Sequence, residues 1–335
     1  MLIEDPLKFA LVIPTYEGTA FLRRCLDYLD SVGYPGQIVL SDDSSGEHRQ
    51  FVQSCAERHP RLCLEAFLYP HPTRFLVKLC DTLDKLSAHY VMLCGQDDFV
   101  IAATLERLVQ LLEARPELSA ARGRIARFHV SRNDAEGGAG SVTLQYLRHP
   151  QRAYLDDDPV ERVLGHLREY SPTLYSVQRR KAALESFRET EAATKNVVFF
   201  QYLASCITAQ LGKIDCVDEM YFARQAHAQS WAAKLQRDYE HFPMLLSSPN
   251  YSRYYLEFRG ALAARLGQHA ASDEQSLEHR IDVAYLNLVR RSLCLTEARS
   301  APDEEFFTRL GNQSSHESAQ LKIIVECVVR HPQSY

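Results

Sequence analysis

The stretch FALVIPTYEGTAFLRRCLDYLDSVGYPGQIVLSDDSSGE, residues 9–47, decides the fold class of this chain. It opens with a continuous apolar run, Phe9–Ile13, of the kind found in strands that are buried on both faces. Apolar residues between positions 21 and 29 then recur at helical spacing. After a break rich in Gly and Pro, a second apolar run, Gln37–Leu40, stops at an acidic, Ser-rich cluster. A strand, a helix and a second strand of these lengths predict a parallel pair with a right-handed crossover.

The alternation of strands and helices continues beyond this unit. Further strands are expected at 62–68, 90–93 and 214–222, and further helices at about 48–57, 75–86, 105–112, 179–187, 197–211 and 321–329. Polar, Gly-rich residues at 133–140 predict a loop or a hairpin tip. This order predicts an α/β fold, with a mostly parallel sheet flanked by helices. Because the pattern is helical beyond about residue 240, we expect one domain at 1–238 and a helical C-terminal subdomain at 239–335.

The composition excludes several classes of protein. The net charge is −5 and the isoelectric point is near 6.2, so no basic excess points to a nucleic acid partner. The nine cysteines are scattered without zinc-site spacing, which fits reduced thiols in the cytosol. Residues 1–8 do not read as a signal peptide, and no apolar run approaches the roughly 20 residues that span a bilayer. We therefore expect a cytoplasmic protein, and interpret Arg179–Lys181 as a solvated helix face.

Polar clusters follow three of the predicted strands. They are Pro14–Glu17, Ser41–Ser45 and Gly95–Asp98. In a parallel α/β sheet, ligands bind beyond the carboxyl ends of the strands. Two adjacent carboxylates repel one another, and such a pair commonly holds a cation or accepts hydrogen bonds from a ligand. A simpler interpretation of the second cluster is that Asp43 or Ser44 caps the following helix.

The order of these segments resembles a known family. Residues 9–47, followed later by YVMLCGQDDF (Tyr90–Phe99), are similar to family 2 glycosyltransferases of the Rossmann-like GT-A fold. The resemblance spans about residues 8–100 and is weaker to about residue 231. It implies inverting transfer of a sugar from a nucleotide-sugar, with a UDP-sugar favoured, to a hydroxyl of a glycan or glycoconjugate. It also implies a divalent cation, Mn²⁺ or Mg²⁺.

The resemblance also implies roles for particular residues. The nucleotide-sugar would be bound by Pro14, Thr15, Tyr16, Glu17, Asp42, Asp43, Arg74, Gln96, Asp97 and Arg224. The metal ligands would be Asp97, Asp98 and His227. The chain departs from the Asp-x-Asp metal motif at its first position, which is Gly95. Ordinary alternatives exist for Arg74, as a surface residue at a helix start, and for Arg224 and His227, as structural loop residues.

The general base is expected about a hundred residues after the metal motif, where the resemblance implies an Asp or Glu. Glu191 is the preferred candidate and Glu189 the second, although both could be first-turn acids stabilised by a helix dipole. Asp156–Asp158 is interpreted as a solvated acidic loop. The aromatic segment Tyr170–Tyr175 would either stack on an acceptor sugar or pack in the core. Trp231 would either cover the site or anchor the C-terminal helices.

Other functions remain open on sequence grounds. A nucleotidyltransferase would carry a Gly-rich basic phosphate loop, whereas residues 14–18 hold one Gly and no Lys. A GT-A-like binding protein without activity is a further alternative, because of Gly95. The absence of a GxGxxG motif after the first strand argues against a classical dinucleotide dehydrogenase. The C-terminal helices would shape the acceptor side or form a homodimer, and their Tyr251–Tyr255 segment would either contact the inner face of the membrane as a peripheral surface or simply face solvent.

Overall fold

The computed structural model of the chain describes residues 8–133, 138–145, 152–227, 248–269, 274–293 and 315–330. Its strands are β1 (Phe9–Thr15), β2 (Gln37–Asp42), β3 (Cys63–Leu68), β4 (Tyr90–Leu93), β5 (Phe99–Val100), β6 (Leu118–Asn133), β7 (Gly138–Gln145), β8 (Val177–Arg179) and β9 (Lys213–Ala226). Its helices are α1 (Thr19–Ser31), α2 (Gly46–Arg58), α3 (Phe75–Lys85), α4 (Ala102–Ala114), α5 (Pro159–Arg168), α6 (Arg180–Ala193), α7 (Val197–Leu211), α9 (Tyr251–Gly267), α10 (Glu274–Leu293) and α12 (His316–Arg330).

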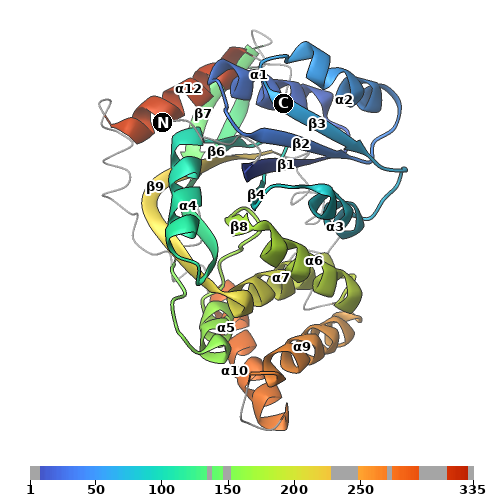
Figure 1. Cartoon of the computed structure of the whole chain (residues 1–335), viewed down its shortest axis with the longest axis vertical. Coiled ribbons are helices and arrows are strands. Elements are labelled where there is room, and N and C mark those ends of the chain that lie inside the picture. The colour runs from blue at the N-terminus through green and yellow to red at the C-terminus, as the bar shows by residue number, and fades with distance from the viewer. Residues whose placement is uncertain are drawn as a thin grey trace.

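The described strands form one mixed sheet in the order β3-β2-β1-β4-β8-β6-β9-β5, with β7 paired to β6. The longest ladders other than β6–β7 are parallel, and helices flank the sheet (Figure 1), so the predicted α/β class is confirmed. In the parallel half, Thr15 lies opposite Asp42 and Val12 lies opposite Leu93. The carboxyl ends of β1, β2 and β4 therefore meet at the same edge of the sheet.

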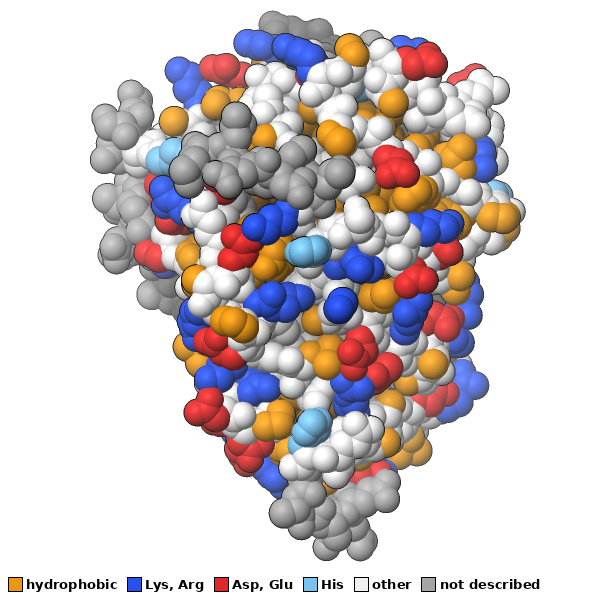
Figure 2. Space-filling view, viewed as in Figure 1, with side chains coloured by type: hydrophobic (Ala, Val, Ile, Leu, Met, Phe, Trp, Pro, Cys, Tyr) orange, Lys and Arg blue, Asp and Glu red, His pale blue; other side chains and the backbone are white. Residues whose placement is uncertain are grey.

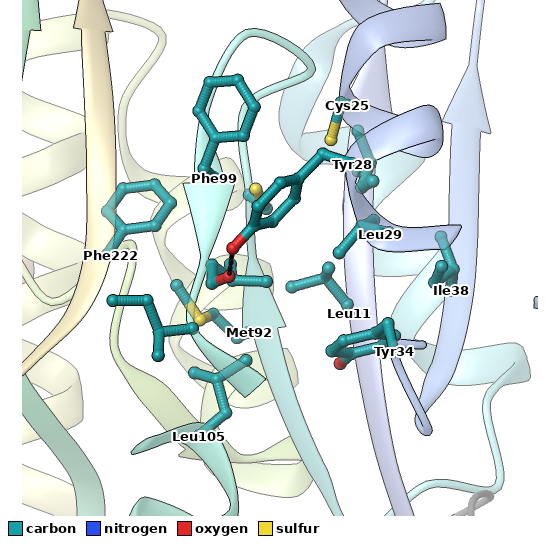
Figure 3. Close-up of a cluster of buried hydrophobic side chains, with 14 of the residues drawn as sticks. Leu11, Cys25, Tyr28, Leu29, Tyr34, Ile38, Met92, Phe99, Leu105 and Phe222 are labelled. Carbon is teal, nitrogen blue, oxygen red and sulfur yellow. Dashed lines mark hydrogen bonds between the residues drawn. The ribbon is translucent and has the colours of Figure 1, made fainter. Parts of the chain in front are cut away.

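The central strand β1 is buried on both faces, as its continuous apolar run predicts. Leu11 and Ile13 pack in one cluster with α1, α2 and α4, whereas Ala10 and Val12 pack in another with α3 and α6. Figure 3 shows the first cluster, in which the Tyr28 hydroxyl donates a hydrogen bond of 2.9 Å to the Val100 carbonyl. This bond satisfies the one polar atom of a fully buried ring.

The part of the sheet beyond β4 differs more from the strands that the sequence predicts. Of the loop or hairpin tip predicted at 133–140, residue 133 ends β6 and residues 138–140 begin β7, whereas residues 134–137 lie outside the described part. The short strand β5 pairs with the end of β9, so that Phe99 lies opposite Ala223. This pairing brings the residues that follow β4 next to residues more than a hundred positions later in the chain.

Two half-buried arginines contact the ends of α4 and α3. Arg179 donates to the Leu118 carbonyl at 2.7 Å and to carbonyls at the end of α4. Arg180 donates to the carbonyls of Leu83 and Ala88, at 2.9 and 2.8 Å. The interpretation of this basic cluster as a solvated helix face is therefore wrong for these two residues, which satisfy carbonyls that a helix end leaves free.

The C-terminal helices pack against two different parts of the molecule. Helices α9 and α10 pack against α5 and α7, whereas α12 lies at the opposite end of the molecule against α1 and β7 (Figure 1). The expected boundary at residue 238 and Trp231 both lie outside the described residues. Tyr255 stacks on Tyr285 with ring centroids 4.6 Å apart, so its ring contributes to packing.

On the face shown in Figure 2, acidic and basic side chains are intermixed, with no extended area of Lys and Arg alone. None of the described helices has the length and apolarity needed to cross a membrane.

Candidate functional site

Asp42 is the last residue of β2 and is fully buried. Its Oδ1 atom accepts hydrogen bonds from the hydroxyls of Thr15 at 2.8 Å and Ser44 at 2.6 Å. Its Oδ2 atom accepts none from the described part of the chain. A buried carboxylate oxygen without a donor is costly, so Asp42 has an acceptor to offer to a ligand.

Asp43 is differently placed, because its carboxylate is already satisfied within the protein. Oδ1 forms a buried ion pair with Lys78, and Oδ2 accepts from the Thr73 backbone N–H at 3.1 Å. Lys78 also donates to the Thr15 carbonyl at 2.8 Å, which ties α3 to the end of β1. The N-cap of α2 is Ser45, so the interpretation of Asp43 or Ser44 as the helix cap is wrong.

The turn between β1 and α1 links the first two polar clusters. The backbone N–H of Glu17 donates to Ser44 Oγ at 3.0 Å, and Glu17 and Gly18 both have positive φ, at 56° and 75°. Tyr16, which follows the Pro14–Thr15 end of β1, is 45% exposed and stacks on His71 with ring centroids 5.8 Å apart. An exposed aromatic pair of this kind suits a planar base.

Gln96 links the same turn to the third cluster. Its Nε2 atom donates to the Glu17 carbonyl at 2.7 Å. The left-handed backbone favours glycine at residue 18, and a Cβ there would lie 2.5 Å from that Nε2 atom and displace the end of the Gln96 side chain. The three polar strand ends are thus joined by a chain of contacts along one edge of the sheet.

Asp97 and His227 come from segments 130 residues apart and meet at the end of this chain of contacts. Asp97 Oδ2 and His227 Nε2 are 2.7 Å apart, and the side chains are 21% and 12% exposed. The His227 ring also stacks on Phe21, with centroids 4.4 Å apart. Both side chains are therefore held by the protein while each keeps part of its surface exposed.

Asp98 lies behind Asp97 and is almost fully buried. Its Oδ1 atom accepts from the Gln225 backbone N–H at 3.0 Å, and its Oδ2 atom lies 3.7 Å from Arg224 Nε. Burial and the charge of Asp97 raise the pKa of Asp98 to about 8, against the opposing effect of Arg224. Asp98 is consequently less suited than Asp97 to bind a cation at neutral pH.

Arg224 presents a cation to the same place. Its guanidinium lies over the ring of Tyr175 at 4.6 Å, and its side chain is 35% exposed. The predicted aromatic segment therefore divides: Tyr175 supports Arg224, whereas Tyr170 packs edge-on against His166 and Tyr202.

The two candidate bases occupy different surroundings at the C-terminal end of α6. Glu191 forms an ion pair with Arg74, the residue that precedes α3, and a second one with Lys195 at 3.0 Å. Glu189 pairs with Arg265 of α9. Because both acids lie near the end of the helix, the interpretation of them as first-turn acids is wrong.

One other acidic expectation also needs correction. Asp158, interpreted as part of a solvated loop, caps α5: its Oδ1 atom accepts from the N–H of Val160 at 2.7 Å and of Glu161 at 3.3 Å. The Asp–Pro pair at the start of α5 carried that signal in the sequence.

The donor atoms present fit a divalent cation only as a partial ligand set. No group of three or more His, Cys, Asp or Glu side chains in the described ranges is arranged to hold a metal ion. Asp97 and His227 offer one carboxylate oxygen and one imidazole nitrogen 2.7 Å apart. Mg²⁺ and similar ions keep several waters and phosphate oxygens around them, so two protein ligands suit an ion that arrives with a diphosphate.

Three residues at this edge were not predicted: Lys78, Arg24 and Gln225. Lys78 pairs with Asp43, and Arg24 donates to the Gln225 side chain. Both cations are buried. The positions of Arg24 and Lys78 in the sequence could have indicated that they are buried. Each lies three residues after a Phe and four residues before a buried Tyr or Thr, on a helix face that is otherwise buried.

Comparison with known proteins gives the following. No protein-family model matches the chain, and no curated protein matches it. Among solved structures, residues 1–349 of S. aureus TarS share 13% identity over 85% of this chain and 90% of that one, with a TM-score of 0.49. The chain spans 54% of the longer TarS structure. The mannosyltransferase PcManGT from Pyrobaculum calidifontis, in complex with GDP-Man and Mn²⁺, shares 14% identity over 99% of this chain and 88% of that one, with a TM-score of 0.47.

Proposed function

We propose that this protein is a glycosyltransferase that moves a sugar from a nucleotide-sugar to an acceptor hydroxyl of a glycan or glycoconjugate, with a divalent cation at the diphosphate. The observation that carries the proposal is the continuous line of polar contacts along the sheet edge. It runs from the buried Asp42 oxygen that accepts no hydrogen bond from the described residues, through Glu17 and Gln96, to the partly exposed Asp97–His227 pair beside Arg224. A nucleoside diphosphate needs such a line, with an acceptor for the base or ribose at one end and cations for phosphates at the other.

The residues at each end of this row of contacts have a proposed role in binding the donor. Asp42 accepts a hydrogen bond from the base or ribose, and Tyr16 lies against the base. Arg224 binds the diphosphate, because a guanidinium presents paired donors to phosphate oxygens. Asp97 and His227 would hold the cation, with Asp98 behind them. When bound, that cation neutralises negative charge on the leaving nucleoside diphosphate.

The acceptor hydroxyl must lose its proton as its oxygen attacks the anomeric carbon. We assign this proton to the carboxylate of Glu191, and the sugar is inverted because the attack is a single displacement. Glu191 is favoured over Glu189 because its partner Arg74 directly precedes α3, on the side where β3 ends. Glu189 is instead neutralised by Arg265 of the C-terminal helices.

The test is nucleotide binding by titration calorimetry with UDP and GDP, each with and without Mn²⁺, followed by hydrolysis of a panel of UDP- and GDP-sugars. We expect one of the two diphosphates to bind only when Mn²⁺ is present. In Asp97→Ala, this Mn²⁺-dependent binding should be lost. Asp157→Ala is the matched control, because Asp157 is an exposed acid paired with Lys213.

Two outcomes would contradict the proposal. Absence of binding by every nucleoside diphosphate in the presence of Mn²⁺ or Mg²⁺ would remove the donor site. Release of pyrophosphate from a nucleoside triphosphate, without turnover of any nucleotide-sugar, would identify a nucleotidyltransferase instead.

A further inference from the structure

Arg24 is a fully buried cation in the helix that follows the nucleotide-binding turn. It belongs to α1 and has no exposed surface. Its guanidinium lies between two aromatic rings, at 5.4 Å from the centroid of Phe21 and 5.2 Å from that of Phe99. A residue so enclosed cannot touch a donor or an acceptor, so any role it has in the reaction must pass through its neighbours.

Those neighbours belong to both halves of the candidate cation site. Arg24 Nη2 donates to the side-chain oxygen of Gln225 and lies 3.5 Å from the backbone carbonyl of Asp97. The backbone N–H of Gln225 in turn donates to Asp98 Oδ1 at 3.0 Å. Arg24 therefore connects the loop after β4 to the end of β9, two segments that must stay in register for Asp97 and His227 to meet.

The same environment fixes His227 from the side. Phe21, whose ring faces the Arg24 guanidinium, also stacks on the His227 ring at 4.4 Å. Burying a guanidinium costs free energy unless hydrogen bonds and nearby opposite charge compensate for it, and an apolar side chain would fill this space more cheaply. What Arg24 adds beyond packing is a directed hydrogen bond and a positive charge behind two adjacent carboxylates.

From these contacts we infer that Arg24 is a positioning residue that, with Gln225, sets the separation and orientation of Asp97 and His227 for binding a divalent cation. The inference rests on the proposed function, since it assigns Arg24 to the cation site of that reaction. Residues that orient metal ligands typically change metal affinity by about 10- to 100-fold when they are replaced.

The experiment titrates the full chain with Mn²⁺ at a fixed, saturating concentration of UDP or GDP, by calorimetry, at a temperature where every variant is folded. We expect Arg24→Met to bind Mn²⁺ about 10- to 100-fold more weakly than the wild type. Arg122→Met is the matched control: Arg122 is equally buried, and it donates to the carbonyls of Ser171, Pro172 and Arg152 instead of the site. It should lose stability while its Mn²⁺ affinity stays within twofold, on the order of the scatter expected for a distant site.

A second variant protects the test against misfolding. Arg24→Met combined with Gln225→Met replaces both partners of the buried hydrogen bond with apolar side chains, a change that is often nearly neutral for stability. We expect the same loss of Mn²⁺ affinity in this double variant. Wild-type affinity in either folded variant would overturn the inference and leave the proposed function standing, whereas a wild-type protein that binds no Mn²⁺ with either UDP or GDP present would overturn both.

Discussion

Gly95 permits a sharp test of the site geometry, because the space around it is filled by the two carboxylates. A Cβ at this position would lie 2.5 Å from Asp97 Oδ1 and 2.7 Å from Asp98 Oδ2. Since Cβ contacts essentially never fall below 3.0 Å, a side chain at residue 95 would displace the carboxylates by about 0.3–0.5 Å or more in a closely packed setting. Glycine at this place in the metal motif therefore has a steric cause.

The displacement has an estimable cost. Asp97 is 2.7 Å from His227 Nε2, and Asp98 accepts from Gln225 at 3.0 Å. A hydrogen bond to a charged group contributes about 1.5–3 kcal/mol. Because about 1.4 kcal/mol corresponds to a factor of ten, losing one such contact should weaken Mn²⁺-dependent nucleotide binding at least about tenfold. The resemblance to an Asp-x-Asp motif suggests the opposite, that Gly95→Asp restores a missing ligand and strengthens binding.

The assay compares Gly95→Ala and Gly95→Asp with the wild type, by calorimetry of UDP or GDP in the presence of Mn²⁺ and by denaturant unfolding without ligand. Gly165→Ala in α5 is the matched control, since nothing lies within 4 Å of a Cβ there. We expect both Gly95 variants to bind more weakly, and Gly95→Ala to lose about 1–3 kcal/mol of unfolding free energy. Tighter binding by Gly95→Asp, or wild-type stability and affinity in Gly95→Ala, would refute the geometric reasoning.

Two further predictions concern the base and the pH dependence of stability. Glu191→Gln should lower the transfer rate by about 10²- to 10⁴-fold, the usual contribution of a general base, while nucleotide affinity changes little; a larger loss in Glu189→Gln, assayed alongside, would reassign the base. His166 donates from Nε2 to the Ser171 carbonyl at 3.1 Å, and burial, with help from Arg122, lowers its pKa from 6.5 to about 3. A folded pKa below the unfolded one means that this contribution to stability is present above about pH 6.5 and is lost as the pH falls toward 3, amounting to about 2 kcal/mol between pH 7.5 and 5. His166→Gln, measured by urea unfolding at both pH values, should show that much less acid destabilisation, and an unchanged pH dependence would contradict the assignment.

The first half of the fold could be predicted because its signals are local. Apolar runs buried on both faces and helical spacing between them identify β1, α1, β2, α3 and β4 within a few residues. The strand β6 was missed because small and charged residues interrupt it. Arg122 and Gly123 lie in its middle, where Arg122 is buried by donating to three loop carbonyls and a Cβ on Gly123 would lie 2.3 Å from the Glu219 carbonyl. Those causes are tertiary contacts, which periodicity does not contain.

The site residues, too, could be predicted where the signal is local and not where it depends on tertiary contacts. Strand ends locate Asp42, Asp43 and Asp97 on one sheet edge, because parallel strands end together. Whether Asp43 faces a ligand or Lys78 depends on which side of α3 packs on β2, and the sequence does not state that. The acid–cation pairs Asp43–Lys78 and Glu191–Arg74 were consequently not predicted, although three of their four members were chosen as site residues.

The cation site depends on the register of β9 against its two neighbours, β6 and β5, and this determines how the site can be lost. The two-residue strand β5 follows Asp98 directly, and its pairing with β9 sets Phe99 opposite Ala223 and Val100 opposite Phe222. The β6–β9 ladder sets Arg224 opposite Arg127, and together with the β5–β9 pair it brings Arg224 and His227 to Asp97 and Asp98, which would otherwise repel one another. The site is therefore assembled only when β9 lies in this register. Because side chains alternate along a strand, a slip of β9 by one residue would turn Arg224 to the other face and disable the site without changing any residue in it.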